Sequence, residues 1–368
     1  MNNSFINRLT KLIYKNHRYL HAFKTSLACL IGLLAYRLFS VEHGQWIIIT
    51  IAVVMGSQIT VGSGEEKSIA RTFATIIGAL AGGLFLLCGF VGQIYYELLA
   101  LFIVSLGFAY LAGSKKYSYV GILGTATFVI VGLSHSFHSG VSDGMMRALD
   151  ILLGVIISIV INRLVFPIYA RKELLASMAG TIDKFRLLIL DCFSLNRSFT
   201  QLESSKYEIQ QTSGISSSFL KQSKLLNESD SYLEKIHFKL NLKEAEELIL
   251  NSKKVFRQTL AMRYTLSLSE KSSIWLKSLN EVKLFLEHVN LFFEYCSHKL
   301  LTYPYDDRSF ILQDKTLKDL LEVIEVEIKI KKENEHIHLY AFIHSLKYFW
   351  KEIKILDTNI KKLTIIKN

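Results

Sequence analysis

Arg71 and Arg147 are the side chains in this sequence best suited to bind a small anion. Each stands near the start of an apolar stretch, seven positions before a glycine, Gly78 or Gly154. A planar guanidinium pairs with a carboxylate through two parallel hydrogen bonds, so both arginines are candidates for binding an organic acid. The alternative is that they anchor helix ends by reaching to the lipid headgroups. The sequence alone leaves both interpretations open.

Asp150 lies three residues after Arg147 and therefore on the same face of a helix. A carboxyl group inside an apolar segment is costly, and it is usually paired or functional. One interpretation is a structural ion pair with Arg147. The other is a carboxyl group that takes up and releases protons, with Arg147 favouring its charged form.

Hydroxyl, amide and small residues occur in the same apolar stretches. The polar side chains are candidates to line a path or to bond neighbouring helices: Thr50, Ser57, Gln58, Thr60, Thr75, Thr125 and Thr127. Small residues four positions apart allow helices to approach closely. We expect this packing role for Gly78, Gly82, Gly83 and Gly154.

These residues lie in stretches that resemble membrane helices. Half of the 368 residues are apolar and 20% are charged, against about 25% charged in soluble proteins. Hydropathy predicts six spans, at residues 22–40, 45–61, 70–91, 94–113, 117–134 and 147–167. The sequence thus predicts an all-α fold, with a six-helix transmembrane module over 1–168 and a helical domain over 169–368.

The distribution of Lys and Arg indicates how these spans are oriented. Basic residues gather before the first span, after the second, after the fourth and after the sixth, and the alternate loops hold almost none. The positive-inside rule then places both termini and the helical domain in the cytoplasm. The net charge of +11 is accordingly assigned to topology and to contact with anionic membrane lipid, and not to nucleic acid.

Two segments indicate an internal repeat. Arg71-Thr-Phe-Ala-Thr-Ile-Ile-Gly78 recurs as Arg147-Ala-Leu-Asp-Ile-Leu-Leu-Gly154, offset by 76 residues. The same offset roughly superposes spans one to three on spans four to six. Because three is an odd number, the two copies would cross the membrane in opposite senses, as in many secondary transporters.

The motifs that contain these arginines resemble those of a known family. Trp46-x-x-x-Thr50 and Arg71-x-x-Ala-Thr75-x-x-Gly78-x-x-x-Gly82 resemble the first signature of fusaric-acid-resistance-like proteins, which include the aromatic acid exporters. Arg147-x-x-Asp150-x-x-x-Gly154, with Val165-Phe166-Pro167, resembles the second signature. Gly56-Ser57 stands where members often have a proline, and Ala74 replaces a familiar glycine.

The resemblance implies an efflux transporter of the bacterial inner membrane for small organic acids, aromatic carboxylic acids in particular, driven by the proton gradient. Many members have two membrane modules and two soluble domains. With one of each here, a homodimer would supply twelve spans, and a periplasmic adaptor is a further candidate partner. The alternative function is a membrane scaffold that does not transport and that anchors a helical interaction domain.

Residues 169–368 show helical periodicity, with helices expected near 170–195, 215–230, 241–268, 271–301, 314–333 and 336–364. The Ser/Gln-rich stretch 194–218 predicts a loop or a disordered segment. Core packing is expected for six aromatic residues: Phe292, Phe293, Tyr340, Phe342, Phe349 and Trp350. No phosphate-binding, hydrolase or zinc motif occurs, and His135 and His138 lack neighbouring ligands, so neither catalysis, a cofactor nor a metal is predicted.

Overall fold

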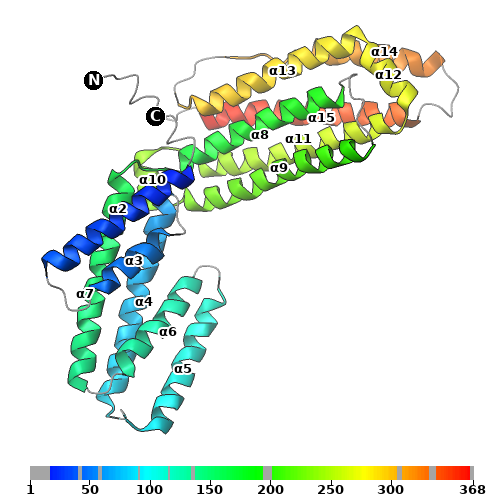
Figure 1. The fold of residues 1–368 in the computed structure, drawn as a ribbon. Helices are drawn as coiled ribbons and strands as arrows, with labels where there is room; N and C mark the ends of the chain where they lie inside the picture. The colour runs from blue at the N-terminus through cyan, green and yellow to red at the C-terminus, as the bar shows by residue number, and fades with distance from the viewer. Residues whose placement is uncertain are drawn as a thin grey trace, which may run out of the picture. The chain divides into compact units, whose positions relative to one another are not determined.

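The computed structural model of this chain describes residues 17–39, 44–56, 60–89, 92–114, 117–133, 137–193, 201–304, 309–330 and 337–364. These residues form α-helices and, within the described ranges, no strands (Figure 1), so the predicted all-α fold is confirmed. The helices are α2 (His17–Leu38), α3 (Gln45–Met55), α4 (Val61–Leu87), α5 (Ile94–Ala112), α6 (Ser118–Gly132), α7 (Phe137–Leu164), α8 (Ala170–Cys192), α9 (Gln201–Glu228), α10 (Tyr232–His237), α11 (Leu242–Ser267), α12 (Glu270–Ser278), α13 (Asn280–Leu301), α14 (Asp314–Ile330) and α15 (Ile337–Thr364).

The chain divides into two compact units. The N-terminal unit comprises Met1–Tyr169 together with Ser231–Glu234, and the C-terminal unit comprises Ala170–Asp230 and Lys235–Asn368. The first unit therefore contains α2 to α7, the helices that carry the candidate anion-binding residues.

Each of the six predicted spans overlaps one helix of the N-terminal unit. Three of the described helices are long and apolar enough to cross a membrane, namely α2 over Tyr19–Leu38, α4 and α5. The apolar helices α3 and α6 have 11 and 15 residues. Eleven residues rise about 17 Å, against a hydrocarbon layer of about 30 Å. Helix length therefore supports three spans directly, and the other three remain a prediction.

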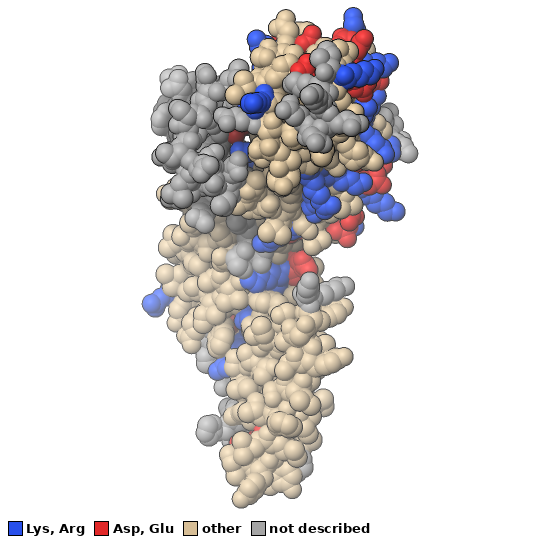
Figure 2. Space-filling model, turned by 90° about the vertical axis from the view of Figure 1, so that its right-hand side faces the viewer, with Lys and Arg blue, Asp and Glu red and all other residues tan. Residues whose placement is uncertain are grey.

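The N-terminal unit exposes apolar side chains that a soluble protein would bury. On α5, Leu98, Phe102, Leu106 and Tyr110 are each more than half exposed, and Phe108 is the only buried residue of that helix. Figure 2 shows a broad surface without Lys, Arg, Asp or Glu. Large exposed apolar patches mark a surface that is solvated by something other than water. Lipid is the solvent that suits such helices.

The structure corrects the predicted start of the third span. Helix α4 begins at Val61, nine residues before the predicted start, because the Thr60 side chain accepts a hydrogen bond from the Ser63 N–H at 3.3 Å and caps it. Arg71 thus lies ten residues inside α4, and Arg147 lies ten residues inside α7. The expected position of both arginines at helix ends is therefore wrong, whereas anchoring to lipid headgroups stays a prediction.

Close helix contacts in the N-terminal unit depend on glycine. A Cβ atom added at Gly78 would lie 2.6 Å from the Gly124 carbonyl oxygen, and one at Gly154 would lie 2.8 Å from the Ile47 carbonyl oxygen. A Cβ at Gly82 would lie 2.8 Å from the Gly132 nitrogen. Gly83 differs, since no atom of the described chain lies within 4 Å of its Cβ position. Gly83 therefore does not pack against another described helix of this chain, contrary to the expectation.

The C-terminal unit has an extensive apolar core. Phe185 of α8, Val255 of α11, Phe292 of α13 and Leu346 of α15 are all fully buried in it. Five of the six aromatic residues expected in the core are buried, whereas Tyr340 is 60% exposed.

Two expectations for this unit are wrong. Helix α9 covers Gln201–Glu228, so the described part of the stretch 194–218 is helical, and Ile215 and Phe219, four residues apart, pack its later turns into the core. The helix expected over 271–301 is divided into α12 and α13 by the extended backbone of Leu279. Of the two histidines discounted as metal ligands, His135 lies outside the described residues.

Candidate anion-binding site

A cavity of about 200 Å³ lies within the N-terminal unit and brings both arginines together. Its walls come from α3, α4, α6 and α7, and we call it the arginine cavity. Trp46, Arg71, Thr75, Thr127 and Arg147 line it, and its other eight lining residues are aliphatic. The site therefore combines an apolar interior with two cationic groups, as is usual for a pocket that binds a small organic molecule.

Arg71 is held in the cavity wall from the middle of α4. Its side chain is only 6% exposed, and its Nε–H has no hydrogen-bond partner in the described structure. Thr75, one turn later on the same face, is also buried and donates its hydroxyl hydrogen to the Arg71 carbonyl oxygen at 2.9 Å. Because that hydroxyl is committed to the backbone, the guanidinium is the stronger donor on this wall.

Arg147 reaches the same cavity from α7. The central carbon of its guanidinium lies 5.5 Å from the centroid of the Trp46 ring, within the range of a cation–π contact. Its Nε–H is buried and, like that of Arg71, finds no acceptor among the described residues. Trp46 thus orients the second cation toward the cavity.

Two buried N–H donors without acceptors determine what this site can bind. A buried donor that lacks a partner destabilises a protein by about 1–3 kcal/mol, and by more when it is charged. Water or a ligand with acceptor oxygens would remove this cost. A carboxylate on an apolar body suits both features, since its oxygens accept from guanidinium and its body contacts the aliphatic wall.

The other predicted site residues lie elsewhere. Thr50 is fully buried against Gly154, and Asp150 is 3% exposed in α7, but neither lines the arginine cavity. Thr125 donates its hydroxyl hydrogen to the Gly121 carbonyl oxygen at 3.2 Å. Ser57 and Gln58 lie outside the described residues.

Trp46 lines the cavity although nothing in the sequence marks it as a candidate site residue. In the sequence it appears only within a family motif, and an aromatic residue in an apolar stretch carries no local signal for a cation–π contact. Its contact with Arg147 arises from the packing of α3 on α7.

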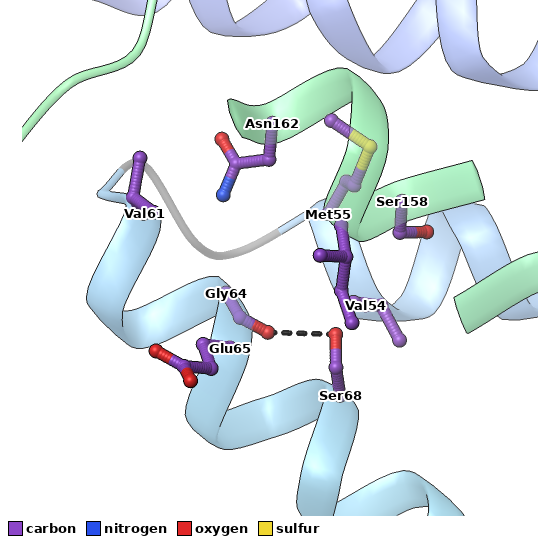
Figure 3. A pocket seen from close by; sticks show the side chains of 9 residues that line it. Val54, Met55, Val61, Gly64, Glu65, Ser68, Ser158 and Asn162 are labelled. Carbon is purple, nitrogen blue, oxygen red and sulfur yellow. Dashed lines mark hydrogen bonds between the residues drawn. The ribbon is translucent and has the colours of Figure 1, made fainter. Parts of the chain in front are cut away.

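A second and much smaller pocket lies between α3, α4 and α7 (Figure 3). Gly64, Glu65, Ser68, Ser158 and Asn162 supply its polar lining. The Ser68 hydroxyl donates to the Gly64 carbonyl oxygen at 2.8 Å. Its volume of about 10 Å³ is close to the minimum needed for one water molecule. This pocket is therefore too small to hold an organic acid.

The exposed apolar helices and the cavity that they enclose are those of a helical integral membrane protein. The chain belongs to the aluminium-activated malate transporter family, whose model matches residues 14–261. It is thus a member of a family of membrane transporters.

Three curated relatives are similar to parts of the chain. The inner membrane protein YeeA of Escherichia coli (strain K12) is 23% identical over 188 residues, which are 50% of this chain and 51% of the relative. The multidrug resistance protein MdtO of the same organism is 30% identical over 169 residues, 44% of this chain and 24% of the relative. The aluminum-activated malate transporter 1 of Triticum aestivum is 26% identical over 200 residues, 49% of this chain and 43% of the relative.

The chain thus spans about half, or less, of the length of the curated relatives that it matches. The family match and these relatives confirm the resemblance to fusaric-acid-resistance-like inner-membrane proteins that the sequence motifs carry.

Proposed function

We propose that this protein exports small organic anions, with aromatic carboxylic acids as the substrate class. The observation that carries the proposal is the arginine cavity, in which Arg71 and Arg147 present buried N–H groups without acceptors. Its volume of about 200 Å³ is larger than that of an apolar cavity of about 150 Å³ that is known to hold benzene. An aromatic ring with one carboxylate is a ligand of suitable size, apolar surface and charge.

Family membership supports transport as the activity. One relative is named a malate transporter, and malate is a small organic anion. Another is named a multidrug resistance protein. For this chain the substrate class rests on the chemistry of the cavity, since aliphatic walls and Trp46 favour an apolar body between the two cations.

The proposed architecture is a six-span module built from two inverted three-helix repeats. The offset of 76 residues supports it, because it relates Gly78 of α4 to Gly154 of α7, and these are the third helices of the two proposed repeats. The contacts agree with it too. Gly78 of α4 packs against α6 of the second repeat, and Gly154 of α7 packs against α3 of the first. Inverted repeats that enclose a central site are suited to alternating access.

We further propose that both termini are cytoplasmic and that the proton gradient drives export. The basic segments support the orientation through the positive-inside rule. Asp150 is the proposed coupling carboxyl group, since it is 3% exposed and lies three residues from Arg147 on α7. A purely structural role for Asp150 is the competing interpretation, and the pH dependence of transport separates the two.

Association into a homodimer belongs to the same proposal, and a periplasmic adaptor remains a candidate partner. The exposed apolar side of α5 is one surface on which two copies could meet within the bilayer. Mass measurement of the detergent-solubilised protein distinguishes a dimer from a monomer of 42.0 kDa.

The test is transport of labelled benzoate into proteoliposomes that contain the purified protein. We expect Arg71→Gln and Arg147→Gln each to raise the half-saturating concentration at least about tenfold, which corresponds to about 1.4 kcal/mol. If both arginines bind one anion, the half-saturating concentration of the double variant should rise by less than the product of the two single-variant fold-changes. Asp150→Asn should remove the dependence of transport on the pH gradient.

Arg163→Gln provides a matched control, because Arg163 is an exposed arginine of α7 outside the cavity. It should transport like the unaltered protein. Transport that is unchanged in both cavity variants would refute the assigned site. Failure of the unaltered protein to move any carboxylate would favour the scaffold function instead.

A further inference from the structure

Tyr119, in the first turn of α6, interacts with two cations of α4. The Lys67 ammonium nitrogen lies 5.1 Å from the centroid of the Tyr119 ring, a cation–π distance. The Tyr119 side chain also interacts electrostatically with the Arg71 guanidinium. One phenol therefore links the arginine cavity to a second basic residue that does not line it.

The donors around this phenol lack acceptors. The Tyr119 hydroxyl is buried and interacts with the Arg71 guanidinium, which can only donate, so the hydroxyl hydrogen itself has no acceptor in the described structure. The Nε–H of Arg71 likewise has no acceptor there. Arg71 is more than nine-tenths buried. An oxygen-bearing anion next to this phenol would accept from both groups and interact with the Lys67 ammonium.

Helix geometry places the two cations on one face of α4. Lys67 and Arg71 are four residues apart on α4, so they share a face and lie about 6 Å apart along the helix axis. Lys67 is the nearer of the two to the start of α4 and is partly exposed, whereas Arg71 is buried. An anion that approaches from the start of α4 therefore meets Lys67 first and Arg71 next.

We propose that Lys67, Tyr119 and Arg71 form an outer carboxylate-binding position, occupied by the anion as it passes between the start of α4 and the arginine cavity. This inference rests on the proposed function and adds a one-sided access route to it. Tyr119 has two parts in this position. Its ring holds the Lys67 ammonium beside the route, and its hydroxyl donates to the carboxylate.

The test measures benzoate transport separately from the two sides of the membrane, in right-side-out and inside-out vesicles. We expect Lys67→Gln to raise the half-saturating concentration about fivefold from one side only, the effect of a partly exposed ion pair. Tyr119→Phe keeps the ring and removes the hydroxyl. It should raise the half-saturating concentration about tenfold from that same side, with an unchanged maximal rate.

Matched variants keep this test decisive. Lys67→Arg should restore most of the affinity, and Arg163→Gln, the same loss of charge at an exposed position of α7, should have no effect. Two results would overturn the outer position and leave the proposed function standing. One is an equal effect of these variants from both sides of the membrane. The other is no effect of Lys67→Gln and Tyr119→Phe while Arg71→Gln impairs transport. Absence of benzoate transport in the unaltered protein would overturn both.

Discussion

Adjacent glycines of α4 provide a controlled test of the helix packing around the arginine cavity. Alanine at Gly82 would place a Cβ atom 2.8 Å from the Gly132 backbone nitrogen and 2.9 Å from the Val131 Cβ atom. Alanine at Gly83 would meet no atom of the described chain within 4 Å. The two substitutions add the same methyl group to neighbouring positions of one helix.

The expected difference follows from these distances. Backbone atoms of α6 cannot yield as a flexible side chain does, so Gly82→Ala must displace α6, at a cost of about 1–3 kcal/mol. Both substitutions gain about 0.8–1 kcal/mol from the higher helix propensity of alanine. Because this gain is common to both, the difference between the variants isolates the clash. We expect Gly82→Ala to be less stable than Gly83→Ala by about 1–3 kcal/mol.

Thermal unfolding of both variants in one detergent measures this difference. A domain of 150–250 residues shifts by about 2–4 °C per kcal/mol, so the melting temperature of Gly82→Ala should lie about 2–12 °C below that of Gly83→Ala. Gly83→Ala should match or exceed the unaltered protein. Equal melting temperatures for the two variants, or a higher value for Gly82→Ala, would refute the close contact of α4 with α6.

Three further predictions concern stability and assembly. Lys24 of α2 is fully buried, and its ammonium group has no hydrogen-bond partner in the described structure. Because an unpaired buried charge is costly, Lys24→Met should raise the melting temperature. A clear fall in the melting temperature would show instead that the lysine stabilises the fold. In the C-terminal unit, hydrogen bonds from Lys354 and then from the Trp350 indole hold the pKa of Asp314 below its usual 3.8. Asp314 therefore contributes stability that is fully present above about pH 4 and lost as pH falls through its folded-state pKa. The melting temperatures of the unaltered protein and Asp314→Asn should thus converge at acidic pH, and a difference that persists there would contradict this. If the protein is a homodimer, light scattering in mild detergent should give a protein mass twice the 42.0 kDa of one chain. A mass equal to that of one chain would exclude the homodimer.

The sequence identified Arg71, Arg147 and Thr75 but misplaced them along their helices. The polar run from Gly62 to Lys67 has the composition of a loop, and only the cap at Thr60 and the packing of Gly64 against Asn162 of α7 extend α4 through it. The cap is local but polar, so a hydropathy scan does not register it, and the contact of Gly64 with Asn162 joins residues about 100 positions apart, which no local pattern reveals. The arginines consequently lie in a cavity wall and not at helix ends.

Other features were beyond the sequence for a similar reason. The cation–π contacts of Trp46 and Tyr119 join residues about 100 and 50 positions apart, which no local pattern reveals. Conversely, the small-residue pattern predicted the same role for Gly82 and Gly83. Only the position of α6 determines which of the two is packed.

Equilibrium binding of labelled benzoate to the purified protein tests the two-arginine site most directly, because it needs neither a gradient nor a defined orientation. The unaltered protein should bind one benzoate per chain in a saturable manner, and the Arg71→Gln/Arg147→Gln variant, folded as judged by its melting temperature, should bind at least about tenfold more weakly. Equal binding by both proteins would contradict the assignment of these two guanidinium groups as the anion site.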